Sequence, residues 1–177
     1  MAVALIDKID SACEKFKQVY KSHIKKFEKL DDWLDKESAI FLNEANFLKN
    51  NYPNFKRGEI IKVDFGVNIG TELSHTHYAI VLNSDDSNNN DNITVLPISS
   101  KNGYRRLHLG KILKEAMPYT QTYNLNCYGM ITQIKTISKK RIFKDNMKYI
   151  CKSDILDKID KSVIEYLTNH NNSNINA

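Results

Sequence analysis

The sequence contains no run of about 18 apolar residues, so no membrane-spanning helix is expected. Its first six residues are apolar, but Asp7 follows at once and no basic leader precedes them, so we expect no secretory signal. Cysteine is scarce: the three cysteines are an odd number, and none forms a Cys-x-x-Cys pair. This disfavours a disulfide framework or a zinc knuckle and predicts a reducing, cytoplasmic environment. A glycine-rich phosphate loop and a βαβ rhythm are also lacking, which excludes the Rossmann and P-loop folds.

The chain does contain enough apolar material for a packed core. Of its 177 residues, 41% are hydrophobic and 10% are aromatic, which predicts one domain of ordinary size or a small domain with an extension. Residues 1–50 hold nine lysines and nine acidic residues, so the net charge of +5 lies entirely in residues 51–177. This basic excess is compatible with binding a phosphate-rich polymer, or with simple solubility.

An amphipathic pattern occupies the first part of the chain. Apolar and aromatic residues recur at steps of three and four between residues 6 and 34, which predicts a long helix that needs a partner. The stripe consists of Ile6, Ile9, Cys13, Phe16, Tyr20, His23, Phe27, Leu30 and Leu34. A second stripe from Ile40 to Leu48 completes a predicted helical hairpin over residues 1–50. Because the charge of this hairpin is balanced, we expect it to serve docking or dimerisation rather than nucleic-acid binding.

The pattern becomes strand-like after Pro53. Apolar runs predict strands at residues 58–65, 78–83, 92–99, 107–109 and 128–137, and the last helix is expected to start near Ser153. Several short strands with one terminal helix predict an α+β fold, in which residues 53–170 form a small barrel with a C-terminal helix. Pro97 is expected at a sheet edge or bulge, the basic residues Lys139, Lys140 and Arg141 in a solvated turn, and residues 171–177 in a disordered tail.

Four segments in register add a family resemblance. They are Phe55–Phe65 (FKRGEIIKVDF), Gly70–Asn83 (GTELSHTHYAIVLN), Ile93–Ser100 (ITVLPISS) and Ile131–Ile142 (ITQIKTISKKRI). In this order they resemble the PemK/MazF family of toxins from bacterial toxin–antitoxin systems, over about residues 55–168. The resemblance implies an SH3-like barrel that forms a homodimer. It also implies an endoribonuclease that needs no metal or other cofactor, cuts single-stranded RNA and is inhibited by a cognate antitoxin. In such enzymes the ribose 2′-hydroxyl attacks the adjacent phosphorus and leaves 2′,3′-cyclic phosphate and 5′-hydroxyl ends.

His77 carries the main chemical expectation. Many family members have Arg-Pro before the second strand, where this chain has His77-Tyr78. The change removes a permanent cation with its bidentate phosphate fork and supplies a group that can act as acid or base near neutrality. We therefore interpret His77 as the main proton-transfer residue, the alternative being a histidine that caps a strand. Ser99 aligns with a family threonine and could donate to a phosphoryl oxygen or cap a turn, with Ser100 as an adjacent alternative.

Further residues could support this site. Glu72 matches a family acidic residue and could orient the site, or be an ordinary exposed loop residue. Gln133 matches a family glutamine that supports the fold or contacts RNA, and Lys135 occupies a family arginine position that could steer phosphate. Basic residues interleaved with an aromatic one suit single-stranded RNA through charge and base stacking, and they follow Ser99 as Lys101, Tyr104, Arg105 and Arg106.

Three alternatives stay open at this point. His75 and His77 would share a strand face and could meet one metal ion, but only Glu72 offers a third ligand, so we expect no metal site. The barrel could also be a module that binds nucleic acid or protein without catalysis, because the family arginine is missing. Finally, residues 1–50 could enlarge a dimer interface or lie over the RNA groove as a restraint.

Overall fold

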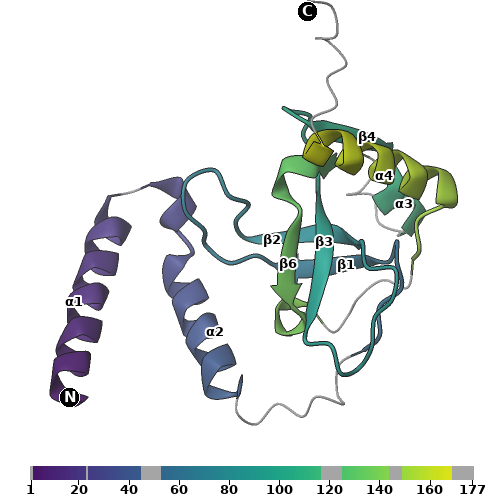
Figure 1. Ribbon diagram of the computed structural model, residues 1–177. Helices are drawn as coiled ribbons and strands as arrows, with labels where there is room; N and C mark the ends of the chain where they lie inside the picture. The colour runs from purple at the N-terminus through teal and green to yellow at the C-terminus, as the bar shows by residue number, and fades with distance from the viewer. Residues whose placement is uncertain (1, 23, 45–52, 117–124, 144–148, 169–177) are drawn as a thin grey trace, which may run out of the picture. The chain divides into compact units, whose positions relative to one another are not determined.

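A computed structural model describes residues 2–22, 24–44, 53–116, 125–143 and 149–168 (Figure 1). The chain forms two compact units. The first comprises Met1–Phe47 together with Gly66–His75, and the second comprises Leu48–Phe65 together with Thr76–Ala177. Within the described residues, no helix is both long and apolar enough to cross a membrane. The predicted disordered tail lies outside the described part of the chain.

The first unit contains two α-helices and a short 3-10 turn, namely α1 (Ala2–Lys21), η1 (Lys25–Phe27) and α2 (Leu30–Leu42). The prediction of one helix over residues 6–34 is therefore wrong. Ser22 ends α1, because both its backbone N–H (3.1 Å) and its hydroxyl (2.5 Å) donate to the carbonyl of Val19. A side chain that binds a local carbonyl in this way competes with the helical hydrogen-bond pattern.

Packing in the first unit is one-sided. Leu30 and Trp33 of α2 are buried. The indole lies against Gly66 so closely that a Cβ there would stand 2.4 Å from Trp33 Cζ2, and Gly66 also has a φ of +78°. Both facts require glycine at this position. The stripe of α1, in contrast, stays in solvent, since Ile6 and Ile9 keep 57% and 54% of their surface exposed.

The second unit is built on six antiparallel strands, which are β1 (Ile60–Asp64), β2 (Thr76–Val81), β3 (Asn92–Ser99), β4 (Arg106–Gly110), β5 (Cys127–Met130) and β6 (Lys135–Ser138). They follow the order β1-β2-β3-β5-β4. Strand β6 pairs with the first half of β3, and the two lie side by side in Figure 1. A bridge from Val63 to Ile142 brings the chain after β6 back beside β1. The sheet thus curls back on itself, and the expected α+β class is confirmed.

Helices cover one part of this sheet. They are α3 (Ile112–Ala116) and α4 (Ser153–Thr168), and two 3-10 turns, η5 (Ile131–Gln133) and η6 (Lys139–Arg141), follow β5 and β6. Ile159 of α4 is fully buried against a core that includes Ile60, Ile80, Leu96 and Leu109. The opposite faces of the same strands are buried too, as Val63 and Val81 show with no exposed surface. The terminal helix near Ser153 is confirmed.

The last predicted strand needs correction, whereas the edge position expected for Pro97 is confirmed locally. The strand predicted over residues 128–137 is interrupted by η5, so its two halves pair with different strands. Pro97 lies inside β3, between the residues that pair with β6 and those that pair with β5, where one side of β3 has no ladder partner. A residue without an N–H is tolerated at such a local edge.

The basic run was expected in a solvated turn, and this is wrong for Lys139. Its ammonium lies 2.6 Å from Asp86 Oδ2, and both side chains are fully buried. It also donates to the carbonyl of Ser87 at 3.0 Å and lies over the ring of Phe55. The pair attaches the loop before β3 to the end of β6, which is a structural role.

Candidate functional site

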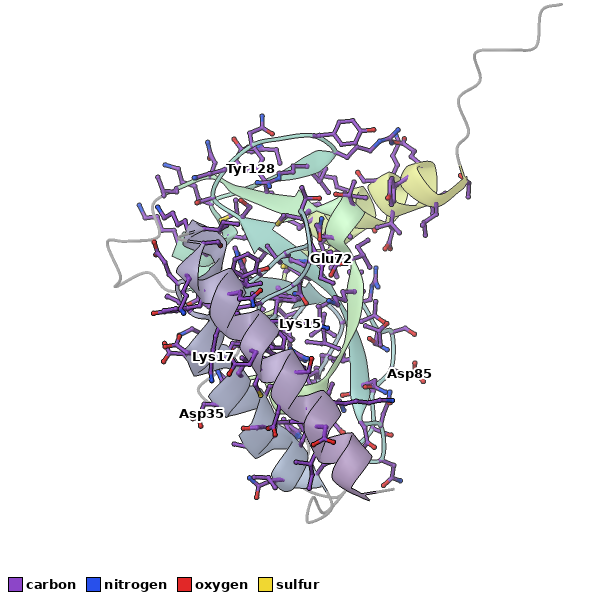
Figure 2. The ribbon with its side chains drawn as sticks, turned by 90° about the vertical axis from the view of Figure 1, so that its left-hand side faces the viewer. Lys15, Lys17, Asp35, Glu72, Asp85 and Tyr128 are labelled. Atoms are coloured by element: carbon purple, nitrogen blue, oxygen red, sulfur yellow. The ribbon has the colours of Figure 1, made fainter. Side chains whose placement is uncertain are left out.

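Strands β2 and β3 bring two predicted residues together where their ladder ends. The last pair of the ladder is Ala79 with Pro97. His77 and Ser99 lie two residues beyond this pair, one on each strand, and both line the same cavity. Ser99 already pairs with Tyr128 of β5, which Figure 2 labels, so β3 leaves β2 and joins β5 at this point. His77 and Ser99 therefore stand at a fork between strands.

A cavity of about 230 Å³ opens at this fork. His77 and Ser99 both line it, and the other walls come from β2, the turn after β3, α3 and the segment before β5, including Tyr78, Ser100, Leu113, Asn126 and Cys127. Ligand pockets for whole small molecules are usually about 300 Å³ or larger. This cavity accordingly fits one part of a larger ligand.

The hydrogen bonds of Ser99 define what its hydroxyl can do. Its Oγ accepts a bond from the backbone N–H of Lys101 at 3.0 Å and another from Nη1 of Arg106 at 2.7 Å. These two donors occupy the acceptor capacity of the oxygen. The hydroxyl proton stays available for donation, and a cationic donor polarises the O–H further. Ser99 is thereby arranged as a hydrogen-bond donor and not as an activated nucleophile.

His77 is held by the strand pair on which it lies. It is half-buried, it is in register with Val63 of β1, and its ring meets Phe65 edge-on with 6.4 Å between ring centroids. Val63 and Phe65 belong to the buried core. The rigid neighbours fix the position of the imidazole in the cavity wall.

Some of the polar and basic residues that follow Ser99 in the chain lie at the site. Ser100 lines the cavity, and Lys101 and Arg106 bind Ser99 as described. Arg105 and Tyr104 are exposed, and they lie beside each other, with Arg105 Nε 3.4 Å from the Tyr104 hydroxyl.

Gln133 and Lys135 do not line this cavity. Gln133 is half-buried in η5 and not on a strand. Lys135 is exposed on β6, opposite Val95.

Glu72 and His75 belong to the first unit. Glu72 is exposed in the segment between β1 and β2 and is labelled in Figure 2. His75 has a φ of +69°, and its N–H donates to the carbonyl of Gly66 at 2.6 Å. Strand β2 starts only at Thr76, so the expected shared strand face of His75 and His77 is not formed. Nowhere in the described ranges do three His, Cys, Asp or Glu side chains gather as a metal site requires.

Sequence reasoning missed the residues that come from the far side of the cavity. Asn126 directly precedes β5 and Cys127 begins it, and only pairing of β5 with β3 brings them to the fork. Burial raises the pKa of the Cys127 thiol, so it stays protonated at neutral pH and forms part of the wall. All three cysteines are free.

Solved structures that resemble this chain include two bacterial proteins. MazF from Deinococcus radiodurans has a TM-score of 0.50 and 15% identity, over 66% of this chain and 98% of that chain. An endoribonuclease from Mycobacterial species has a TM-score of 0.47 and 12% identity, over 67% of this chain and 95% of that chain. At such identities the likeness to the first protein shows a shared fold alone. No curated protein sequence gives a significant match.

A family model matches residues 56–167, which is more than half of the chain. The model describes PemK-like, MazF-like toxins of type II toxin–antitoxin systems. The matched range contains β1 to β6 and most of α4, together with the fork and its cavity. The resemblance seen in the four sequence segments is confirmed, and the chain belongs to the family of PemK-like, MazF-like toxins.

Proposed function

We propose that this toxin is a metal-independent endoribonuclease that cuts single-stranded RNA by attack of a ribose 2′-hydroxyl on the adjacent phosphorus. The observation that carries the proposal is that His77 and Ser99 line one cavity at the strand fork of a toxin-family domain. The 2′-oxygen forms a bond to phosphorus as the bond from phosphorus to the 5′-oxygen breaks. The products are a 2′,3′-cyclic phosphate and a 5′-hydroxyl.

This reaction needs a base for the 2′-proton, an acid for the leaving 5′-oxygen and donors for the phosphoryl oxygens. His77 is the proton-transfer residue, because an imidazole can accept or donate a proton near neutrality. Ser99 donates its O–H to a phosphoryl oxygen, since its lone pairs are already used by Lys101 and Arg106. The substrate carries its own nucleophile, so Ser99 needs no activation by a base.

The supporting residues act on the RNA strand outside the reacting atoms. Ser100 lines the cavity and offers a second hydroxyl, and Lys101 adds positive charge at its edge. Lys135 steers phosphate from β6, and Gln133 supports the fold beside it. Glu72 and His75 lie in the loop between β1 and β2 and help to orient the RNA strand.

Two macromolecular partners follow from the family. Type II systems pair the toxin with a protein antitoxin, so we expect a cognate antitoxin that blocks the RNA site. A homodimer is the expected assembly. Residues 1–50 strengthen this dimer, because a second copy presents the same heptad stripe, which stays exposed here along α1 at Ile6, Ile9, Phe16 and Tyr20.

The central test is cleavage of mixed single-stranded RNAs in the presence of EDTA, with analysis of the new ends. We expect cyclic phosphate ends, and a loss of rate on the order of 10²-fold or more in His77→Ala, as for removal of an acid–base group. His108→Ala is the matched control, because His108 is exposed on β4, packs on the Tyr128 ring and does not line the cavity. Unchanged cutting by His77→Ala means that the assignment of His77 is wrong.

A second candidate function is RNA or protein binding without turnover. The replacement of the family arginine by His77 favours it, because a permanent phosphate-binding cation is missing at that position. Long incubation with mixed RNAs separates the two functions. Binding without any new RNA ends supports the second candidate and contradicts the first.

A further inference from the structure

A second cavity, of about 350 Å³, lies between the start of β4 and the C-terminal half of α4. Arg105, Arg106, Ser162, Glu165 and Tyr166 are among the residues that line it. None of its walls is shared with the cavity at the strand fork. Two arginines and one carboxylate give it a net positive charge. None of the residues from α4 was expected to take part in function.

Arg106 connects the two cavities. Its Nη1 donates to Ser99 Oγ in the first cavity (2.7 Å) and to the carbonyl of Lys101 (2.6 Å), while its side chain lines the second cavity. Within the described residues, Nε and Nη2 have no acceptor and no carboxylate pairs with the guanidinium. A half-buried cation held only by neutral oxygens favours an anion beside it, and a free pair of guanidinium donors matches two phosphate oxygens.

Arg105 and Tyr166 line the other side of the second cavity, and the ring of Tyr104 lies beside Arg105 outside the lining. The guanidinium carbon lies 5.9 Å from the ring centroid of Tyr104 and 5.7 Å from that of Tyr166. Arg105 holds this position with a φ of +49°, a left-handed backbone conformation that is unfavourable in a residue other than glycine. Exposed aromatic rings and a flat guanidinium are surfaces on which nucleobases stack.

We propose that this second cavity is a nucleotide subsite for a residue of the RNA strand that flanks the cleaved bond. Arg106 binds the phosphate of that nucleotide, and Tyr166 with Arg105 stacks on its base. The strand passes from one cavity to the other across Arg106, whose bond to Ser99 links phosphate binding to the catalytic hydroxyl. That the bound polymer is RNA rests on the proposed function. Binding at the subsite, in contrast, does not require that the protein cleaves RNA.

Glu165 adds a preference among bases. A carboxylate accepts hydrogen bonds from exocyclic amino groups, which adenine, cytosine and guanine carry and uracil lacks. We therefore expect the subsite to bind an amino-bearing base more tightly than uracil. Glu165→Gln should reduce this difference.

The test uses the full chain and a probe that cannot be cleaved. Fluorescein-labelled 12-nucleotide 2′-O-methyl RNA of random sequence is titrated with protein, and binding is followed by anisotropy. Tyr166→Ala should weaken binding roughly 5-fold to 150-fold, which is the usual loss for one stacked base. Tyr166→Phe keeps the ring and should bind as the natural protein does. His108→Ala on β4 removes an exposed aromatic ring that lines neither cavity and should have no effect.

Salt dependence gives a second, independent readout. Arg106→Gln should reduce the slope of log Kd against log salt concentration by about 0.7, as for one lost phosphate contact on a single strand. Equal binding by Tyr166→Ala and the natural protein overturns the proposal. The proposal is also overturned if Tyr166→Ala makes the protein monomeric in sedimentation while its monomers bind RNA normally. The second cavity would then be part of a protein–protein interface.

The binding assay tests the subsite and the cleavage assay tests the endoribonuclease, so each proposal can be contradicted independently of the other. A protein that binds the probe through Tyr166 but produces no RNA ends retains the subsite and loses the endoribonuclease. A protein that cuts RNA with unchanged probe binding in Tyr166→Ala retains the endoribonuclease and loses the subsite.

Discussion

The two units of the chain place their apolar side chains in opposite ways. In the second unit, Ile60 and Ile80 are completely buried between the curled sheet and its helices. In the first unit, Ile6 and Ile9 of α1 keep more than half of their surface exposed, and the apolar groove between α1 and α2 has a volume of about 710 Å³. The second unit buries its own apolar residues in a core, whereas the apolar stripe on α1 is exposed.

The largest expected effect that tests this comparison is on stability. Ile80→Ala should destabilise the second unit by about 2–5 kcal/mol, because it leaves a cavity in a closely packed core. Ile9→Ala, the matched change on α1, should cost less than about 0.5 kcal/mol, as exposed substitutions do. Urea denaturation of both variants measures the difference. Equal losses would contradict the solvent exposure of Ile9 on α1, and a loss for Ile9→Ala that grows with protein concentration indicates assembly through α1.

A smaller effect is expected within the first unit. Gly66→Ala places a Cβ against the Trp33 indole at a positive φ, so we expect a loss of roughly 1–3 kcal/mol. Gly70→Ala is the control, since Gly70 also has a positive φ but a Cβ there meets nothing within 4 Å; it should cost about 1 kcal/mol. Trp33 is the only tryptophan in the chain, so its fluorescence reports unfolding of the first unit specifically. Identical shifts for the two variants would show that Trp33 does not pack on Gly66.

The smallest expected effect is on the pH dependence of the stability of the second unit. Tyr149 donates to Glu115 at 2.9 Å, and burial, followed by this bond, raises the pKa of Tyr149 to about 12. The ordinary pKa of tyrosine is about 10. The unfolded chain therefore loses this proton first, and the stability that Tyr149 contributes is complete below about pH 10 and is lost between about pH 10 and 12.

Tyr149→Phe should flatten the decline of stability with pH over that interval. A residual decline from about pH 9 is expected from Cys151, whose pKa burial raises to about 12. Melting curves at several alkaline pH values measure both slopes. A Tyr149→Phe protein with the same pH dependence as the natural chain rules out this linkage.

Much of the second unit was predictable because its signals are local. Apolar alternation predicted β1, and a compact apolar run predicted β2, since neighbours in the chain decide which side chains can share a face. The same local reasoning gave a wrong prediction for the first unit, where the apolar stripe indicated one helix over residues 6–34. Its spacing continues past Ser22, but the hydroxyl of Ser22 binds the Val19 carbonyl and ends the helix. The spacing of apolar residues does not reveal that the Ser22 side chain competes with the helical hydrogen bonds.

The candidate site was predictable only where the family pattern named its residues. His77 and Ser99 were expected, and the register of β2 with β3 places them together. Asn126, Cys127 and Tyr166 had no local signal, because they reach their cavities through pairing of β5 and packing of α4. The burial of Lys139 was missed for a related reason, since its partner Asp86 lies in a distant loop.

By itself, the sequence determined β1 to β4 and α4 of the second unit, its basic charge and the toxin family, since these depend on residue type and short spacing. The tertiary structure alone decided that Ser99 accepts from Arg106, that Gly66 lies against Trp33 and that the stripe on α1 remains uncovered. The physical reason is that such contacts join residues far apart in the chain, and their free energy depends on distance and burial, which composition and periodicity do not specify.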